Sequence, residues 1–260
     1  MMSAMTVGQY NLIYNAFSFA FAALAAATLF FWLERGQVAT PYRTALTVTG
    51  LVTFIASYHY LRIFESWTAA YSIVDGTLVA SGTVFNDAYR YVDWLLTVPL
   101  LLIELILVMG LNRRETMSRG LRLGALAALM VALGYPGEVA ADVSGRWVWG
   151  IASMIPFLWI VVELFGGLSK AVAAQPEDAR GLVNMARWVT VLSWSFYPVV
   201  YFAGAIGLEG ATANTVVQVG YTIADIVAKA GFGMLIYMIA VRKSTVSRVA
   251  SDALIANAIV

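Results

Sequence analysis

Lys229 and Asp225 are two ionisable side chains in the middle of an apolar stretch of this chain. If the stretch is helical, their four-residue spacing puts both on one face, about one turn apart. An ionisable group in such a setting is costly and marks a candidate functional site. Desolvation favours the neutral amine of a lysine, which can condense with a carbonyl compound to form a Schiff base. Asp225 could then balance the protonated form, although a structural ion pair between helices explains the same spacing.

A second polar set interrupts the apolar stretch around residues 87–110. Arg90, Asp93 and Thr97 follow one another at spacings of three and four residues, which place them on one helical face. Glu104 follows eleven residues after Asp93, so it returns to nearly the same face ~16 Å further along the helix. Two separated carboxylates with a titratable nitrogen between them are the components of a proton relay. The alternative is a set of hydrogen bonds between helices.

His59 is the single histidine of the chain. Taken alone, it can equally be an ordinary polar side chain that makes its hydrogen bonds inside a helix bundle. The chain has no second histidine and no cysteine, so a metal site of the usual nitrogen and sulfur ligands is not expected.

The composition indicates that these residues lie in a membrane protein. Of the 260 residues 61% are hydrophobic and 12% are charged, whereas soluble domains carry about 25% charged residues. We therefore expect a lipid bilayer as the surroundings and one compact helical domain over residues 1–260. No basic run suggests nucleic acid as a partner. The chain start has no charged segment before its first apolar stretch, so we expect that stretch to remain as a helix.

Seven apolar segments can be laid out, and their lengths suit helices across a bilayer, which needs roughly 20 residues per helix; the fourth segment is the shortest. This predicts an all-α bundle of seven transmembrane helices. The segments cover residues 10–33, 43–64, 87–110, 119–134, 145–167, 181–205 and 213–240. In the long connection 65–86, Asp75 and Gly76 form a two-residue turn sequence between two short runs of strand formers, 71–74 and 77–79. A short hairpin is expected there.

The basic residues predict the orientation. Twelve of the 16 lysines and arginines fall at one side of a seven-span arrangement. They are Arg35, Arg43, Arg113, Arg114, Arg119, Arg122, Lys170, Arg180, Arg187, Arg242, Lys243 and Arg248. Positive charge gathers on the cytoplasmic side of membrane proteins. The N-terminus is therefore expected outside and the C-terminus in the cytoplasm.

Three ordered motifs resemble the signatures of the microbial rhodopsins. They are Arg-Tyr-Val-Asp-Trp-Leu-Leu-Thr-Val-Pro at 90–99, Trp-Ser-Phe-Tyr-Pro at 194–198 and Asp-Ile-Val-Ala-Lys at 225–229. The sequences at 85–90 and 135–138 are similar to the xanthorhodopsin branch of the bacterial proton pumps. The resemblance implies a seven-helix bundle in the cell membrane around all-trans retinal, bound as a Schiff base to Lys229 and isomerised by light.

The resemblance also implies roles for the polar residues. Asp93 matches the proton acceptor and counterion, Asp225 the second counterion, and Arg90 a residue that balances their charge. Glu104 matches the proton donor on the cytoplasmic side, a carboxylic acid kept protonated by apolar surroundings. His59 matches a histidine that pairs with the acceptor carboxylate Asp93 in this branch.

Further residues match the family's chromophore pocket. The expected aromatic walls are Trp94, Trp194, Tyr197 and Tyr201, and the expected neighbours of the polyene chain or ring are Met130, Ser153 and Phe157. Gly150 matches a position where most relatives carry a bulky aromatic residue. In xanthorhodopsin-like proteins, glycine there opens a window through which a carotenoid antenna reaches the ring. Close helix packing is the alternative explanation for this glycine.

The preferred function is a light-driven outward proton pump, an ion transporter rather than an enzyme. Asp93, Thr97 and Glu104 are the discriminating residues, because chloride and sodium pumps of the family differ at these positions. A sensory photoreceptor of the same fold, signalling to a partner, is the alternative, and a membrane protein without retinal is a third. By resemblance we expect a homo-oligomer, a pentamer or a trimer. Glu209 is the sole acid expected in the connection between the last two helices, where the archaeal pumps keep a glutamate pair for proton release.

Overall fold

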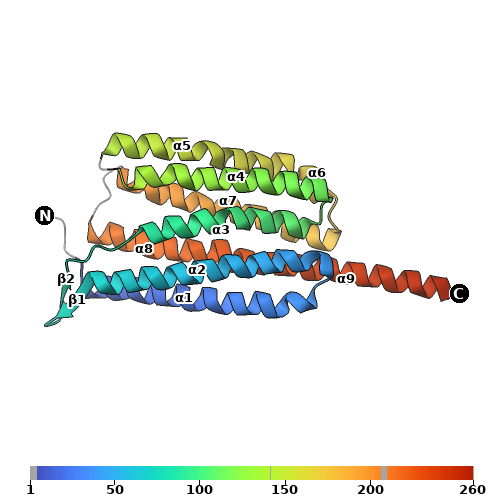
Figure 1. The fold of residues 1–260 in the computed structure, drawn as a ribbon, viewed down its shortest axis with the longest axis horizontal. Helices are drawn as coiled ribbons and strands as arrows, with labels where there is room; N and C mark the ends of the chain where they lie inside the picture. The colour runs from blue at the N-terminus through green and yellow to red at the C-terminus, as the bar shows by residue number, and fades with distance from the viewer. Residues whose placement is uncertain (1–4, 141, 206–209, 260) are drawn as a thin grey trace.

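The computed structural model of the protein describes residues 5–140, 142–205 and 210–259, and Glu209 lies outside these ranges. Within them, seven helical rods run side by side and form one bundle (Figure 1). The predicted all-α, seven-helix architecture is therefore confirmed.

The first four rods are single helices. They are α1 (Val7–Glu34), α2 (Arg43–Ala70), α3 (Ala88–Met109) and α4 (Arg113–Glu138). The fifth is α5 (Val143–Val162) with its π-helical continuation η3 (Glu163–Gly167), followed by the short α6 (Ser169–Ala173). The sixth is α7 (Glu177–Ala205). The seventh joins α8 (Ala211–Ile226), the π-helical turn η4 (Val227–Gly231) and α9 (Phe232–Ile259).

Five of these rods are long and apolar enough to cross a membrane by length and composition: α1, α3, α4, α5 with η3, and α8 with α9. In α2, polar side chains such as Thr49, Thr53 and His59 are buried, so its polarity faces the interior of the bundle. On the outside, large apolar side chains such as Phe19 and Leu121 are 65% and 64% exposed. Polar side chains that turn inward from an apolar exterior suit a bilayer, where lipid replaces water around the protein.

Several helix ends differ from the sequence prediction. Helix α4 begins at Arg113 rather than Arg119, because the side chain of Asn112 caps it by accepting the backbone N–H of Glu115 at 2.9 Å. The same helix continues past Gly134 to Glu138. Helix α2 extends to Ala70 rather than ending at Phe64, which shortens the connection to α3.

The predicted hairpin in this connection is confirmed. Strands β1 (Tyr71–Val74) and β2 (Thr77–Ala80) pair antiparallel. Asp75 and Gly76 both have positive φ, 50° and 74°, as the tightest hairpin turns require. The hairpin marks one end of the bundle. The connections α1–α2 and α3–α4, together with α6, lie at the opposite end, toward which α9 extends (Figure 1). The basic residues of these connections therefore gather at the end opposite the hairpin, and the assignment of that end to the cytoplasm stays a prediction.

Candidate functional site

Lys229 lies in the π-helical turn η4, halfway along the last rod, and its side chain is 1% exposed. Its Nζ is 2.5 Å from Asp225 Oδ1 and 2.8 Å from Asp93 Oδ2. Asp225 comes from the preceding turn of the same rod, as the four-residue spacing predicts, whereas Asp93 comes from α3. Two carboxylates from different helices therefore flank one buried amine. The π-helical turn was not foreseen, and such turns inside α-helices are frequent at functional sites.

Asp225 is held by neutral donors from three other helices. Tyr60 of α2 donates to Oδ2 at 2.8 Å, and Tyr197 of α7 donates to Oδ1 at 2.7 Å. Trp94 of α3 donates its Nε1–H to Oδ1 at 3.1 Å. Hydrogen bonds from neutral donors stabilise a carboxylate in its charged form. This arrangement makes Asp225 a fixed anion beside Lys229.

Asp93 has a different environment. Among the described residues, no hydroxyl or neutral N–H donates to its carboxylate. Thr97 donates to the backbone carbonyl of Asp93 at 2.8 Å, so it braces the helix rather than the carboxylate. Its predicted partner His59 has Nδ1 3.9 Å from Asp93 Oδ1 and 2.9 Å from the carbonyl oxygen of Ile55. The two side chains are thus adjacent without a direct hydrogen bond, and their pairing stays a prediction.

Arg90 lies one turn from Asp93 toward the hairpin end, and its side chain is 2% exposed. The guanidinium forms an ion pair with Asp87 and lies 5.4 Å from the ring centre of Phe17 and 5.5 Å from that of Tyr221. Within the described residues, its Nε and Nη2 have no hydrogen-bond partner. Arg90 therefore adds positive charge between the buried centre and the surface.

Glu104 is fully buried in α3. Along this helix, Arg90 lies on the hairpin side of Asp93, and Glu104 lies on the opposite side. Thr49 of α2 lies beside it. Neither carboxylate oxygen has a hydrogen-bond partner within the described residues. All four residues of the predicted stripe, Arg90, Asp93, Thr97 and Glu104, are buried on this helix.

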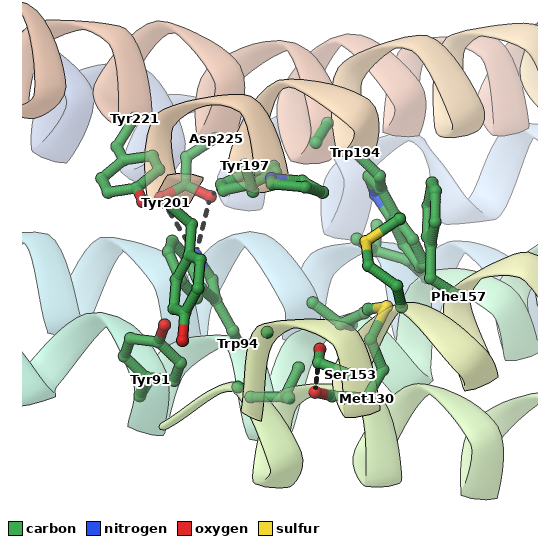
Figure 2. Close-up of a pocket in the computed structure, with 18 of the residues that line it drawn as sticks. Tyr91, Trp94, Met130, Ser153, Phe157, Trp194, Tyr197, Tyr201, Tyr221 and Asp225 are labelled. Atoms are coloured by element: carbon green, nitrogen blue, oxygen red, sulfur yellow. Dashed lines mark hydrogen bonds between the residues drawn. The ribbon is translucent and has the colours of Figure 1, made fainter. Parts of the chain in front are cut away.

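An apolar pocket begins at Lys229 and Asp225. Figure 2 shows Asp225, Tyr197 and Tyr221 near one end of this pocket and Trp194 and Phe157 near the other. Every residue predicted for the chromophore pocket lines it: Trp94, Met130, Gly150, Ser153, Phe157, Trp194, Tyr197, Tyr201 and Lys229. The hydroxyl of Ser153 donates to the carbonyl of Met130 at 2.8 Å, which joins α5 to α4 (Figure 2).

Gly150 lies in the pocket wall but is covered rather than open. A Cβ added there would come within 2.6 Å of Tyr201 and 2.8 Å of Phe202, both on α7. The ring of Phe202 stacks on that of Trp147 at 4.7 Å. The missing side chain is thus used for close approach of α5 and α7 in this structure. An opening at this position requires the two α7 rings to move.

The sequence prediction missed two tyrosines of the site. Tyr91 and Tyr221 line the pocket, and the ring of Tyr221 lies 5.6 Å from that of Tyr197 and 5.4 Å from that of Trp94. Tyr221 precedes Asp225 by four residues, so helical spacing could have placed it on the same face. Tyr91 follows Arg90 directly, and its position offered no such indication.

Seven packed helices with an apolar exterior, an apolar pocket and a buried lysine between two carboxylates define a membrane protein that handles charge inside its bundle. Comparison with known proteins specifies the class further. The model of the family described as bacteriorhodopsin-like protein matches residues 11–243. The chain belongs to this family, the microbial rhodopsins, as its motifs indicated.

Individual relatives agree. The chain is 36% identical over 227 residues to the green-light absorbing proteorhodopsin of gamma-proteobacterium EBAC31A08, covering 86% of this chain and 84% of the relative. It is 32% identical to bacteriorhodopsin of Halobacterium salinarum, over 83% and 79% of the two chains. The crystal structure of xanthorhodopsin, described as a light-driven ion pump with dual chromophore, superposes with a TM-score of 0.91 at 47% identity, over 95% of this chain and 99% of that one. The protein is therefore a multi-pass protein of the cell membrane and an ion transporter rather than an enzyme.

Proposed function

We propose that this protein is a light-driven outward proton pump. The observation that carries the proposal is the position of the Lys229 nitrogen, 2.8 Å from Asp93, which shares helix α3 with the buried Glu104. One carboxylate can take a proton from this nitrogen, and another on the same helix can return one from the opposite direction. The resemblance to proton-pumping relatives supports this use of the two acids.

The pocket suits all-trans retinal, a long apolar aldehyde. Its walls are aromatic and apolar, and its one amine lies at the end where Asp225 and Tyr197 meet. Retinal bound to Lys229 as a Schiff base would supply light absorption and a change of shape on isomerisation. Trp94 and Trp194 would hold the polyene between their rings, and Phe157 with Met130 would enclose the far end. Lys229 is 1% exposed, so the walls separate its nitrogen from bulk solvent.

The unequal environments of the two carboxylates assign their roles. Asp225 has three neutral donors that stabilise its charge, so it remains an anion throughout. Asp93 has no such donors among the described residues, so its charge depends mainly on the cation at Lys229. Both carboxylates lie within hydrogen-bond distance of the Lys229 nitrogen, and Asp93, the one without stabilising neutral donors, accepts the proton that this nitrogen releases. His59, with Nδ1 3.9 Å from Asp93 Oδ1, can then interact with the protonated carboxyl group of Asp93.

Glu104 returns the proton. A fully buried carboxyl group without a partner is favoured in its neutral form, because an isolated charge is costly in an apolar environment. Its spacing of eleven residues puts it ~16 Å from Asp93 along α3. Glu104 therefore holds a proton in reserve toward the end opposite the hairpin. With that end in the cytoplasm, the net movement of protons is outward. A sensor has no need of this donor, which disfavours the photoreceptor alternative.

A carotenoid antenna is the finer part of the proposal. The similar xanthorhodopsin structure carries a dual chromophore, and Gly150 removes the side chain that would otherwise close α5 over the pocket. Trp147, three residues before Gly150, is 39% exposed and stacks on Phe202, so it adds apolar surface beside this position. A carotenoid would displace Tyr201 and Phe202 from above Gly150. We also propose a homo-oligomer on the basis of the family resemblance.

The retinal assignment is tested by adding all-trans retinal to membranes that contain the protein. A visible absorption band should form with the wild type and not with Lys229→Ala, because the bond to the amine is then impossible. A Lys229→Ala variant that gains the same band as the wild type would overturn the assignment. A coloured wild type that moves no protons in the light would favour a sensor.

A further inference from the structure

A second charged cluster lies at the hairpin end of the bundle, between Arg90 and the surface. Asp87 directly precedes α3, and its ion pair with Arg90 joins a partly exposed carboxylate to a buried guanidinium. The Asp87 side chain is 39% exposed, whereas that of Arg90 is 2% exposed. Two guanidinium nitrogens of Arg90 have no hydrogen-bond partner among the described residues. A buried guanidinium that has two unpaired N–H groups within the described residues is thus paired with a partly exposed carboxylate.

Glu138 brings a second carboxylate to the same place from the end of α4. Tyr91 donates to Glu138 Oε2 at 3.4 Å, and Tyr91 also lines the pocket at Lys229. Asp87, Arg90 and Arg146 are close enough to Glu138 to interact with its charge. Arg146 also donates to the backbone carbonyl of Glu138 at 3.5 Å. Glu138 is partly buried, so it can hold a proton close to the surface, within electrostatic reach of Asp87.

We propose that Asp87 and Glu138 form the proton-release site, the last protein groups to hold the exported proton before it enters the medium. The inference rests on the proposed pump function and assigns a site that sequence reasoning had left open. The proposed site lies at the start of α3 and the end of α4, rather than in the connection between the last two helices.

The charges explain how the site would be coupled to the buried centre. Arg90 interacts with Asp225 on one side and with Asp87 on the other. In the resting protein, Asp93 and Asp225 are both anions, and Asp87 and Glu138 share one proton. When Asp93 takes the proton from the Lys229 nitrogen, the net charge of the centre stays the same, but the Asp93 carboxylate, one turn from Arg90, becomes neutral and no longer attracts the guanidinium. The charge of Arg90 then acts more strongly on Asp87 and Glu138, which release their shared proton to the medium. Asp93 later returns its proton to the pair, so one proton leaves per cycle.

The test is a flash experiment on the whole protein loaded with all-trans retinal, with a pH-indicating dye in the medium. Visible absorption reports the loss of the proton from the Lys229 nitrogen, and the dye reports proton arrival in the medium. Glu138→Gln and Asp87→Asn are compared with Glu65→Gln as the control. Glu65 is an exposed acid at the same end, paired with Arg62 at 2.8 Å. The visible band shows that each variant has folded.

In the wild type and in Glu65→Gln, proton arrival should follow loss of the proton from Lys229 without a long lag. In Glu138→Gln and Asp87→Asn, arrival should lag by about 100-fold or more, the lower range for removal of a positioned acid or base, while the absorption step keeps its rate. Wild-type timing in both variants would overturn the release site, as would an equal delay in Glu65→Gln. A wild type that releases no proton at all would instead overturn the pump function.

Discussion

The nitrogen of Lys229 lies 2.8 Å from Asp93 and 2.5 Å from Asp225, yet the two carboxylates are held in different ways. Asp225 accepts hydrogen bonds from a tryptophan and two tyrosines, whereas Asp93 has no neutral donor within the described residues. Hydrogen-bond distance from the same amine therefore does not give the two carboxylates the same readiness to accept its proton. The asymmetry separates an acceptor from a permanent counterion.

Replacement of Asp93 by Asn should abolish pumping, because the one carboxylate then left beside the Lys229 nitrogen within the described residues, Asp225, is held as an anion by its three neutral donors. We expect loss of the proton from this nitrogen after a flash to slow by about 100-fold or more, as measured by visible absorption. Asp93→Glu keeps the carboxylate and serves as the matched control, with partial activity. Undiminished pumping by Asp93→Asn would contradict the assigned role.

Replacement of Glu104 by Gln should leave the first proton transfer unchanged and slow the recovery of the resting state by about 100-fold or more. The proton must then come directly from the medium, so recovery should become faster as the medium is made more acidic. Flash photolysis at several pH values measures both effects. Glu115→Gln is a suitable control, because this acid is exposed at the same end of the bundle. Recovery at the wild-type rate would show that Glu104 is not the donor.

Replacement of Gly150 by Trp should block the carotenoid without preventing retinal binding. A side chain at this position occupies the space beside Tyr201 and Phe202, where even a Cβ would come within 2.6 Å of a neighbouring atom. The action spectrum of pumping, recorded on protein reconstituted with retinal and a carotenoid, should show carotenoid bands for the wild type alone. A Gly150→Trp variant that keeps those bands would place the antenna elsewhere.

Lys243 makes a prediction about stability. This buried lysine donates to the carbonyls of Val108 and Met109 at 3.0 and 2.6 Å and to Gln175 Oε1 at 2.8 Å. It thereby ties α9 to the end of α3, whose carbonyls carry partial negative charge.

Lys243→Met should lower the free energy of unfolding by about 1–3 kcal/mol, because the carbonyls lose a charged donor. Titration with SDS, followed by loss of the visible band, measures this change. Lys170→Met is the control, since Lys170 is exposed at the same end. Equal stability of the two variants would mean that the Lys243 contacts contribute little.

Local spacing accounts for the parts of the structure that the sequence could predict. Asp75 and Gly76 specified the hairpin turn, and the spacing of Asp93 and Glu104 specified the polar stripe of α3. Likewise, Asp225 and Lys229 fell on one face because helical geometry repeats.

Features that depend on contacts between distant segments were not predictable in this way. The sequence Tyr-Pro-Gly after Gly134 resembles a helix end, but α4 continues to Glu138. Gly137 permits this, because α4 there approaches α7 so closely that an added Cβ would lie 1.9 Å from the Tyr201 hydroxyl. The covering of Gly150 depends equally on α7. The π-helical turn at Lys229 depends on backbone hydrogen bonding, which residue spacing does not encode.

The central claim, outward proton pumping, is tested most directly by the light-induced pH change in a suspension of cells that express the protein with all-trans retinal. The account predicts that illumination acidifies the medium and that a protonophore abolishes the change. Alkalinisation that the protonophore enhances would contradict it, because protons would then be following another transported ion. A coloured protein with no pH change in either condition would contradict it as well, in favour of a sensor.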